Sequence, residues 1–329
     1  MKSERYIVFL LAIVLCACSH VPIPEATIVV RECASMPCGG RASASACALN
    51  EKAYIFAGRM YAWDQLKDLW EYNPQTDTWT QHGEAPMKAR VNAVIAANND
   101  KLYLGLGYAA QRAYQDTAYM HDWWEYTPAS RQWKQLADFP SPYTVASLSF
   151  AIDNHIYVMY GTGIPGFSKE IWQYNIDTDT WVKTDNNPSR PKPNCGGRGA
   201  WSGGLYYYGT GYDTHNLTSW YSSDIKNDQW TICASIPGKG REFSACAAND
   251  TYVYLFGGQY FGGDITGGWE IFDSYMRYLP AKNQWEWCGQ MPCGRAVNQI
   301  AFSINGKVYF GLGEDDKQHT IDKLYCIEE

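Results

Sequence analysis

The sequence predicts an all-β protein, a propeller of six four-stranded blades, from two repeating patterns and a match between the two ends of the chain. The composition agrees with this fold class. Aromatic residues make up 15% of the 329 residues, and the chain contains 25 Tyr, 14 Trp and 29 Gly. Tyr and Trp favour the half-buried, pleated surface of a strand. No long stretch carries apolar residues at a 3.6-residue period, so we expect little helix.

The first pattern is a Tyr followed seven residues later by a Trp, with turn-forming residues between them. Pro, Asp and Asn in the middle favour a turn, and the aromatic ends favour strands, so each copy predicts a β-hairpin. A fifth copy keeps the turn and the Trp but begins with Ser223. The spacing of about fifty residues between copies is typical of propeller blades. The copies are 72–79, 126–133, 174–181, 223–230 and 278–285.

The second pattern is an apolar, Tyr-rich strand that ends in glycine. It occurs six times, which predicts six blades. A polar turn precedes each copy, and the turn before the last copy contains Asn305-Gly306, a strong hairpin signal. The terminal glycine is expected to permit a bulge or a tight turn as the strand leaves the blade. The copies are 54–58, 102–107, 156–163, 205–211, 252–258 and 308–313.

The two ends of the chain are expected to share one blade. The last blade stops at Leu324–Cys326, one strand short, while residues 30–41 align with residues 285–295. The segment Thr27–Cys33 therefore predicts the outer strand of blade six, a closure that removes open sheet edges. The same alignment matches Cys33 and Cys38 with Cys288 and Cys293. Each pair is either a local disulfide or a pair of small, buried apolar residues.

These motifs resemble those of the Kelch repeat family, whose units carry a strand ending in a glycine pair and then a spaced Tyr and Trp. The resemblance covers about residues 26–329 and implies one four-stranded blade for each unit. The chain departs from the family pattern at the glycines. Only Gly257-Gly258 is a true pair, and the other copies read Ala-Gly, Gly-Leu-Gly or Gly-Thr-Gly.

The N-terminus carries an export signal. Lys2 and Arg5 precede an apolar run of twelve residues, which is short for a membrane span. The run ends in Leu15-Cys16-Ala17-Cys18, which resembles the bacterial lipobox. We expect residues 1–18 to be a lipoprotein signal peptide with Cys18 lipidated, residues 19–26 a tether, and residues 27–329 the propeller. The alternative is an ordinary signal peptide. The lipobox predicts a membrane-anchored lipoprotein in the periplasm, the outer membrane or at the cell surface.

Several functional classes are disfavoured. The net charge is -7 and the basic residues form no cluster, which argues against nucleic acid as a partner. The six His show no pair at metal-ligand spacing, and Cys-x-x-Cys does not occur, so we expect no metal and no cofactor. Gly-x-Ser-x-Gly is also absent from the sequence.

Arginine recurs at the predicted start of the innermost strand, three or four residues after a proline. Because the innermost strands circle the axis, we predict that these arginines converge at one mouth of the channel and receive a carboxylate or phosphate. The Kelch resemblance implies the same. The alternative is that each arginine bridges neighbouring blades. Blade four leaves the position open between Arg190 and Arg198, and blade three carries Tyr143 and Thr144 there. The other arginines are Arg41, Arg90, Arg241 and Arg295.

Three aromatic segments exceed what the repeat requires. They are Trp123-Trp124, Tyr206–Tyr208 and Tyr260-Phe261. Such rings either stack on sugars or pack between blades.

Three functions fit these observations. The first is an envelope module that binds a glycan, in particular an acidic sugar, or a protein loop at the arginine-lined mouth. The second is a sugar mutarotase of the N-acetylneuraminate epimerase type, which the chain resembles in blade count, export and Gly-Leu-Gly strand ends. That resemblance implies Glu-x5-Arg after a strand-end glycine; Glu314 follows Gly313, but Thr320 stands in place of the arginine. Glu314 is therefore the candidate catalytic residue. The third function is an architectural scaffold.

Overall fold

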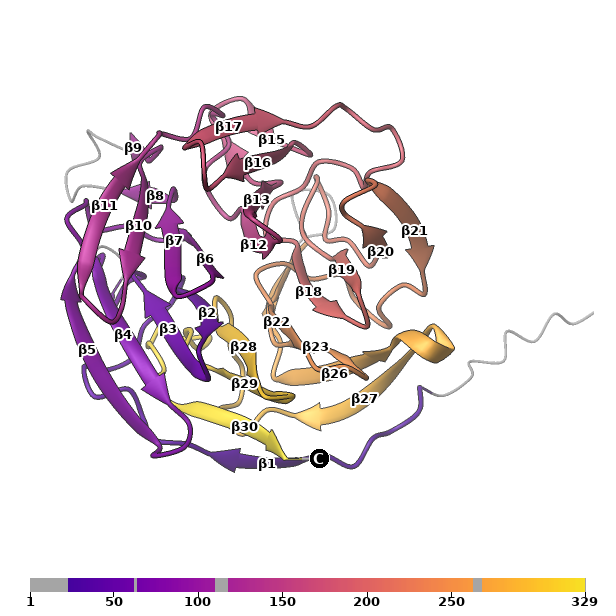
Figure 1. The fold of residues 1–329 in the computed structure, drawn as a ribbon. Coiled ribbons are helices and arrows are strands. Elements are labelled where there is room, and N and C mark those ends of the chain that lie inside the picture. Colours follow the sequence, from indigo (N-terminus) through magenta and orange to yellow (C-terminus); the bar gives the residue numbers. More distant parts are fainter. Residues whose placement is uncertain (1–22, 62–63, 110–117, 263–267, 329) are drawn as a thin grey trace, which may run out of the picture.

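The computed structural model describes residues 23–61, 64–109, 118–262 and 268–328. They form six four-stranded antiparallel sheets around a central axis (Figure 1), which confirms the predicted six-bladed all-β propeller. Cys18 and the predicted signal peptide lie outside the described residues. Within those residues, no helix has the length and apolar character needed to cross a membrane.

Each blade runs from an innermost strand at the axis to an outer strand at the rim of the molecule (Figure 1). The innermost strands are β2 (Ser45–Leu49), β6 (Val94–Asn98), β12 (Leu148–Ile152), β18 (Arg198–Ser202), β22 (Ala245–Ala248) and β28 (Ile300–Ile304). The second strands are β3 (Lys52–Phe56), β7 (Lys101–Gly105), β13 (His155–Met159), β19 (Leu205–Gly209), β23 (Val253–Phe256) and β29 (Lys307–Gly311). The third strands are β4 (Asp68–Asn73), β10 (Trp123–Thr127), β16 (Ile171–Asn175), β20 (Trp220–Asp224), β26 (Ser274–Leu279) and β30 (Leu324–Glu328).

The outer strands are β5 (Thr78–Glu84), β11 (Gln132–Leu136), β17 (Thr180–Lys183), β21 (Gln229–Cys233), β27 (Gln284–Gln290) and β1 (Val29–Glu32). Three short hairpins lie outside the six sheets. They are β8 (Tyr108–Ala109) with β9 (Ala118–Tyr119), β14 (Thr162–Gly163) with β15 (Gly166–Phe167), and β24 (Gln259–Phe261) with β25 (Trp269–Ile271). A short 3-10 helix, Pro280–Lys282, precedes β27.

The N-terminal strand closes blade six, as predicted. β1 pairs antiparallel with β30, from Val29 opposite Glu328 to Glu32 opposite Tyr325. The chain before β1 is also paired, because the Ala26 amide donates to the Trp287 carbonyl and the Trp287 amide to the Pro24 carbonyl, both at 2.8 Å. Residues 24–26 therefore lie on blade five and belong to the propeller, not to the tether that the sequence suggested.

The recurring Tyr and Trp join blades one, three and five to the blade before them. The Tyr72 hydroxyl donates to Asp77 Oδ1 at 2.6 Å, and the same oxygen accepts the Ala34 amide at 2.8 Å. Trp79 Nε1 donates to the Ala34 carbonyl at 2.8 Å. Ala34 follows β1, so these bonds join blade one to blade six. The same contacts recur in the sets Tyr174, Asp179, Trp181 with Ala137, and Tyr278, Asn283, Trp285 with Ala234.

The glycine signature marks two successive residues in the left-handed region. The first has φ between 52° and 63° and is Ala57, Leu106, Tyr160, Thr210, Gly257 or Leu312. The second is always glycine, with φ between 89° and 105°. A Cβ on Gly313, for example, would lie 2.6 Å from the Val297 carbonyl oxygen. The second position therefore requires glycine, whereas the first accepts other residues, which explains the departures from a strict glycine pair.

The hydrophobic core lies between neighbouring blades. Tyr72 and Ile55 of blade one pack with Phe302 and Tyr309 of blade six, and the same arrangement follows around the ring. Of the two alternatives for the matched cysteines, the disulfides do not form: the cysteines at 33, 38, 288 and 293 are all thiols. They pack in or against these inter-blade cores, so the alternative of small apolar residues holds.

Candidate functional site

A cavity of about 230 Å³ lies on the propeller axis, and all six innermost segments line it. Six strands converge there, so its wall consists mostly of small side chains. Arg198, the first residue of β18, is the one charged residue among the described residues that line the cavity. At the corresponding first position of the innermost strand, the other blades carry Ser45, Val94, Leu148, Ala245 and Ile300.

Arg198 is held by backbone groups and by one ring. Nε donates to the Ser244 carbonyl at 2.8 Å and Nη1 to the Gly197 carbonyl at 2.9 Å, while the guanidinium lies 5.6 Å from the Phe243 ring centroid. Among the described residues, Nη2 has no hydrogen-bond partner and no carboxylate pairs with Arg198. Burial lowers the pKa of Arg198, but a guanidinium remains charged at neutral pH. This guanidinium lines the cavity without an ion-pair partner among the described residues, which favours an anion there.

Arg41 and Arg90 bridge strands within the protein instead of facing the channel. Both are at most 1% exposed. Arg41 binds Asp68 through two hydrogen bonds of 2.8 and 3.0 Å, and Arg90 binds Asp122 in the same way at 2.7 and 2.9 Å. The prediction that these arginines converge at the channel mouth is wrong for both residues. Asp68 begins β4 and Asp122 directly precedes β10, so both aspartates lie within reach of the arginine position.

Arg241 occupies the same position in blade five but lacks a carboxylate. The Gly257 amide bonds to the Ser274 carbonyl, where the equivalent amide of blade one bonds to Asp68, so a serine replaces the aspartate. The buried guanidinium donates to the Gly257 carbonyl at 3.1 Å and lies 4.1 Å from the Phe272 ring centroid. Burial lowers the pKa of Arg241 to about 10, although Glu270 offsets part of this effect. Arg241 is thus covered by protein and does not line the channel cavity.

Arg295 is displaced by one residue. It follows its proline by three residues, whereas Arg41, Arg90 and Arg241 follow theirs by four. The bridge between Val297 and Glu314 corresponds to that between Ala42 and Arg59, so Ala296 takes the arginine position. The Arg295 side chain is 54% exposed, with Asp316 at 3.5 Å. The predicted arginines therefore do not form a ring around the channel.

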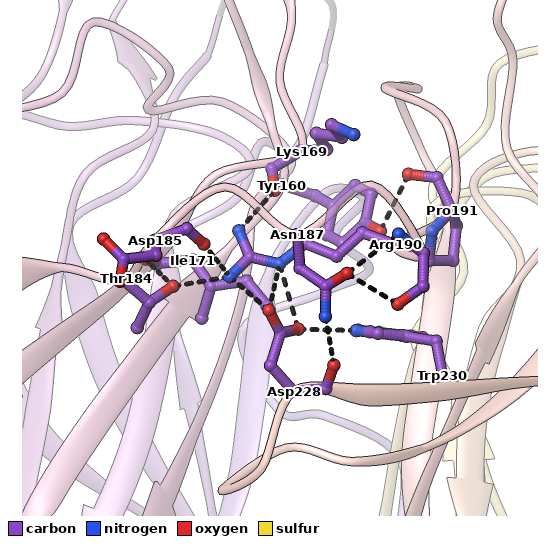
Figure 2. Close-up of polar contacts among 11 residues, drawn as sticks. Tyr160, Lys169, Ile171, Thr184, Asp185, Asn187, Arg190, Pro191, Asp228 and Trp230 are labelled. Atoms are coloured by element: carbon purple, nitrogen blue, oxygen red, sulfur yellow. Dashed lines mark hydrogen bonds and ion pairs between the residues drawn. The ribbon is translucent and has the colours of Figure 1, made fainter.

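Figure 2 shows why Arg190 is not the channel arginine of blade four. Its Nε lies 3.0 Å from both carboxylate oxygens of Asp228, and its Nη2 donates to Thr184 Oγ1 and to the Asp185 carbonyl, both at 2.7 Å. Trp230 Nε1 donates to the same carboxylate at 2.8 Å. Arg190 therefore links the loop after β17 to the β20–β21 turn, and of the two blade-four arginines it is Arg198 that lines the cavity.

Most of the surplus aromatic residues pack between blades. Trp123 and Tyr206–Tyr208 are buried. Tyr260 is half-buried beneath Lys239 Nζ, which lies 5.2 Å from the ring centroid. Phe261 is 43% exposed and is available to a ligand.

A series of backbone hydrogen bonds joins five of the six blades at one mouth of the channel. Just before the innermost strands, the Asn92 amide donates to the Ser43 carbonyl, Ser43 to Asn298, Asn298 to Phe243 and Phe243 to Gly196, at 3.0 to 3.1 Å. In each blade, the residue after the second glycine of the glycine signature forms a backbone bridge with a residue just before the innermost strand. We call these six residues the channel rim: Arg59, Tyr108, Thr162, Tyr212, Gln259 and Glu314.

Glu314, the candidate from the sequence, is a buried rim residue. Arg59 Nη2 lies 2.6 Å from both of its carboxylate oxygens, and Asn298 Nδ2 donates to Oε1 at 3.0 Å. Thr320, which stands where the resemblance implied an arginine, pairs with Glu314 through a backbone bridge. An arginine does reach Glu314, but it comes from blade one.

A second carboxyl group, which the sequence did not single out, belongs to Glu242. It is 6% exposed and accepts a hydrogen bond from Gln259 Nε2 at 3.0 Å, and Trp269 Nε1 donates to Gln259 Oε1 at 3.2 Å. Burial raises the pKa of Glu242, and the Gln259 hydrogen bond offsets only part of this effect. In the described part of the chain, no cation forms an ion pair with Glu242. Glu314 is paired with Arg59, whereas Glu242 is buried without an ion pair among the described residues. Carboxyl groups in such different environments are suited to different roles.

Comparison with known proteins supports a Kelch-type propeller. The Kelch motif model matches residues 40–81. The N-acetylneuraminate epimerase of Shigella flexneri is 34% identical over 125 residues, which is 37% of this chain and 32% of that protein. The protein of the same name from Escherichia coli strain K12 is 33% identical over the same coverage. The match thus spans about a third of the length of these relatives, at 32%.

A solved structure, that of YjhT, shares the fold. It superposes with a TM-score of 0.77 at 14% sequence identity and covers 90% of this chain and 99% of that chain. Together with the six sheets, these findings show a six-bladed Kelch-type propeller that resembles the N-acetylneuraminate epimerases over part of its length.

Proposed function

We propose that this chain binds an acidic sugar, N-acetylneuraminate or a chemically similar one, in the central channel, with Arg198 receiving the sugar's carboxylate. The observation that carries this proposal is a guanidinium that lines the axial cavity and forms no ion pair with a carboxylate in the described residues. A guanidinium binds a carboxylate through charge-assisted hydrogen bonds. The partial match to proteins named N-acetylneuraminate epimerase supports a sugar of this class.

Replacing Arg198 by alanine is expected to weaken binding of N-acetylneuraminate by about 10- to 150-fold. This range corresponds to the roughly 1.5–3 kcal/mol of a hydrogen bond to a charged group. Isothermal titration calorimetry measures the loss, and the wild-type affinity should fall as salt rises. The exposed Arg295 provides the matched control, because Arg295→Ala should leave the affinity unchanged. Equal affinities for the wild type and Arg198→Ala would contradict the proposal.

The second candidate function is catalysed mutarotation of the same sugar, and Glu242 favours it. Opening a sugar ring moves a proton from the anomeric hydroxyl to the ring oxygen, so a carboxyl group with a raised pKa is suited to the task. Glu242 is such a group, and its neighbour Phe243 packs against Arg198. The bound carboxylate would thus lie near a group able to exchange protons.

If the chain is a mutarotase, Glu242→Gln should lower the enzymatic exchange rate of the anomers by about 10²- to 10⁴-fold. NMR exchange spectroscopy measures this rate after subtraction of the uncatalysed rate. The wild-type rate should rise with pH through the raised pKa of Glu242, because the ionised form accepts the proton. Calorimetry should show that the variant still binds the sugar. A wild-type protein that binds the sugar without accelerating exchange would leave binding as its function.

A further inference from the structure

Exposed apolar side chains gather on the hairpins that extend from the channel rim. Ile164, Phe167, Phe261 and Trp269 are 85%, 36%, 43% and 52% exposed. All four lie in or between the strands of β14–β15 and β24–β25, which begin at the rim residues Thr162 and Gln259. The blade framework does not need these side chains, because both hairpins lie outside the six sheets.

Three of the rings in this region form a row across neighbouring blades. Phe167 of blade three meets Tyr212 of blade four edge-to-face, with ring centroids 6.3 Å apart. Tyr212 in turn meets Phe261 of blade five at 5.9 Å. Trp269 is paired with Phe261 in the hairpin register. We call Phe167, Tyr212 and Phe261 the aromatic row.

The aromatic row borders the channel on the side of Arg198. The backbones of Tyr212 and Cys195 exchange hydrogen bonds of 2.8 and 3.0 Å, three residues before Arg198. On the other side, Gln259 begins the strand that carries Phe261 and bonds to Glu242. Glu242 is followed by Phe243, which packs against the Arg198 guanidinium. The row is therefore linked to the proposed carboxylate site indirectly, through the backbone bonds of Tyr212 and through the strand that carries Phe261.

The chemistry of the row suits sugar rings. Aromatic rings that are partly exposed offer a flat apolar face, and polar groups beside them can bind hydroxyls. Such groups are present: Trp269 Nε1 and Gln259 are hydrogen-bonded at 3.2 Å, and Lys239 pairs with Glu270 at 2.6 Å next to Tyr260. Aromatic rings and hydrogen-bonding groups therefore lie together beside the channel mouth.

We propose that the aromatic row is a second sugar subsite, and that the ligand of this chain is an acidic oligosaccharide. Its acidic end lies at Arg198 and its following sugar rings stack on Phe167, Tyr212 and Phe261. This inference rests on the proposed function, because Arg198 sets the position of the first sugar.

The test compares N-acetylneuraminate with the trisaccharide sialyllactose by isothermal titration calorimetry. The wild type should bind the trisaccharide more tightly. The double variant Phe167→Ala/Phe261→Ala should lose about tenfold in affinity for the trisaccharide and keep its affinity for the single sugar, as expected for lost ring contacts. Ile232→Ala is the matched control, because Ile232 is 80% exposed on the outer strand β21. This variant should bind both sugars like the wild type.

The two proposals fail in different ways. If Arg198→Ala binds both sugars as tightly as the wild type, or neither sugar binds, the proposed function is overturned and the second subsite with it. If Arg198→Ala weakens both sugars but the trisaccharide has no advantage in the wild type, the subsite alone is overturned. The same holds if the double variant weakens both sugars equally. A row that serves a protein partner would also give the trisaccharide no advantage.

Discussion

Deletion of residues 27–33 is expected to abolish cooperative folding. The deletion removes β1, so β30 becomes an unpaired edge and the buried Tyr325 and Ile327 lose part of their cover. It also removes the ion pairs of Arg31 with Glu328 at 2.8 Å and of Lys323 with Glu32 at 2.6 Å. Closure ties the first and last segments into one blade, so its loss should open the whole ring.

Differential scanning calorimetry tests this expectation. The truncated protein should lack the sharp transition of the full chain, and a synthetic peptide of residues 24–34 added in excess should restore it, because binding to the native state stabilises it. The same peptide with Val30→Asp is the matched control, since Val30 packs against the core between blades five and six. A truncated protein that melts sharply at the original temperature would contradict the closure.

Arg41→Ala is expected to destabilise the protein by about 3–5 kcal/mol, because it leaves the partly buried Asp68 carboxylate without its ion-pair partner, with only Trp70 Nε1 of the described residues still donating to it. Urea unfolding monitored by Trp fluorescence measures the free energy of unfolding. The exposed Arg295→Ala should change it by no more than about 0.5 kcal/mol. This comparison separates a structural arginine from a surface one.

A double variant identifies the cause of that loss. Arg41→Met/Asp68→Leu removes both charges and keeps the volume, so it should recover much of the stability and bind N-acetylneuraminate like the wild type. An Arg41→Ala protein of normal stability that no longer bound the sugar would instead support the arginine ring that the sequence suggested.

The fold was predictable because local contacts recur from blade to blade. The Tyr–Trp spacing is visible in the sequence since Asp77 and Trp79 both bind Ala34, and Tyr72 donates to the same Asp77 oxygen. The glycine is visible since a side chain at Gly313 would collide with a backbone carbonyl. Both constraints are local to one blade and its neighbour, so they recur at nearly constant spacing.

The site was less predictable because its contacts join residues that are distant in sequence. Asp68 lies 27 residues from Arg41 and Asp122 lies 32 residues from Arg90, and nothing in the strand-entry pattern shows that these pairs form. Arg295 lies one residue before the arginine position of the other blades, and its side chain is therefore exposed at the surface. The signal for Arg198 was present, however, because it stands between Gly197 and Gly199 in a strand position where other blades carry uncharged residues.

Glu242 is a site residue that the sequence did not single out. It directly follows Arg241, but the sequence offered no reason to prefer it over the other acidic residues. Its environment comes from Gln259, which lies 17 residues away, and from the packing of blades four and five around it. A buried carboxyl group of this kind is recognised only when the blades are assembled.

A crystal structure of the protein with N-acetylneuraminate is the most direct test of whether Arg198 receives the carboxylate of an acidic sugar. We expect the sugar in the axial cavity, with a carboxylate oxygen about 2.7–2.9 Å from an Arg198 nitrogen. A sugar bound at Arg59, at Arg295 or elsewhere on the surface, with none in the axial cavity, would contradict this role of Arg198.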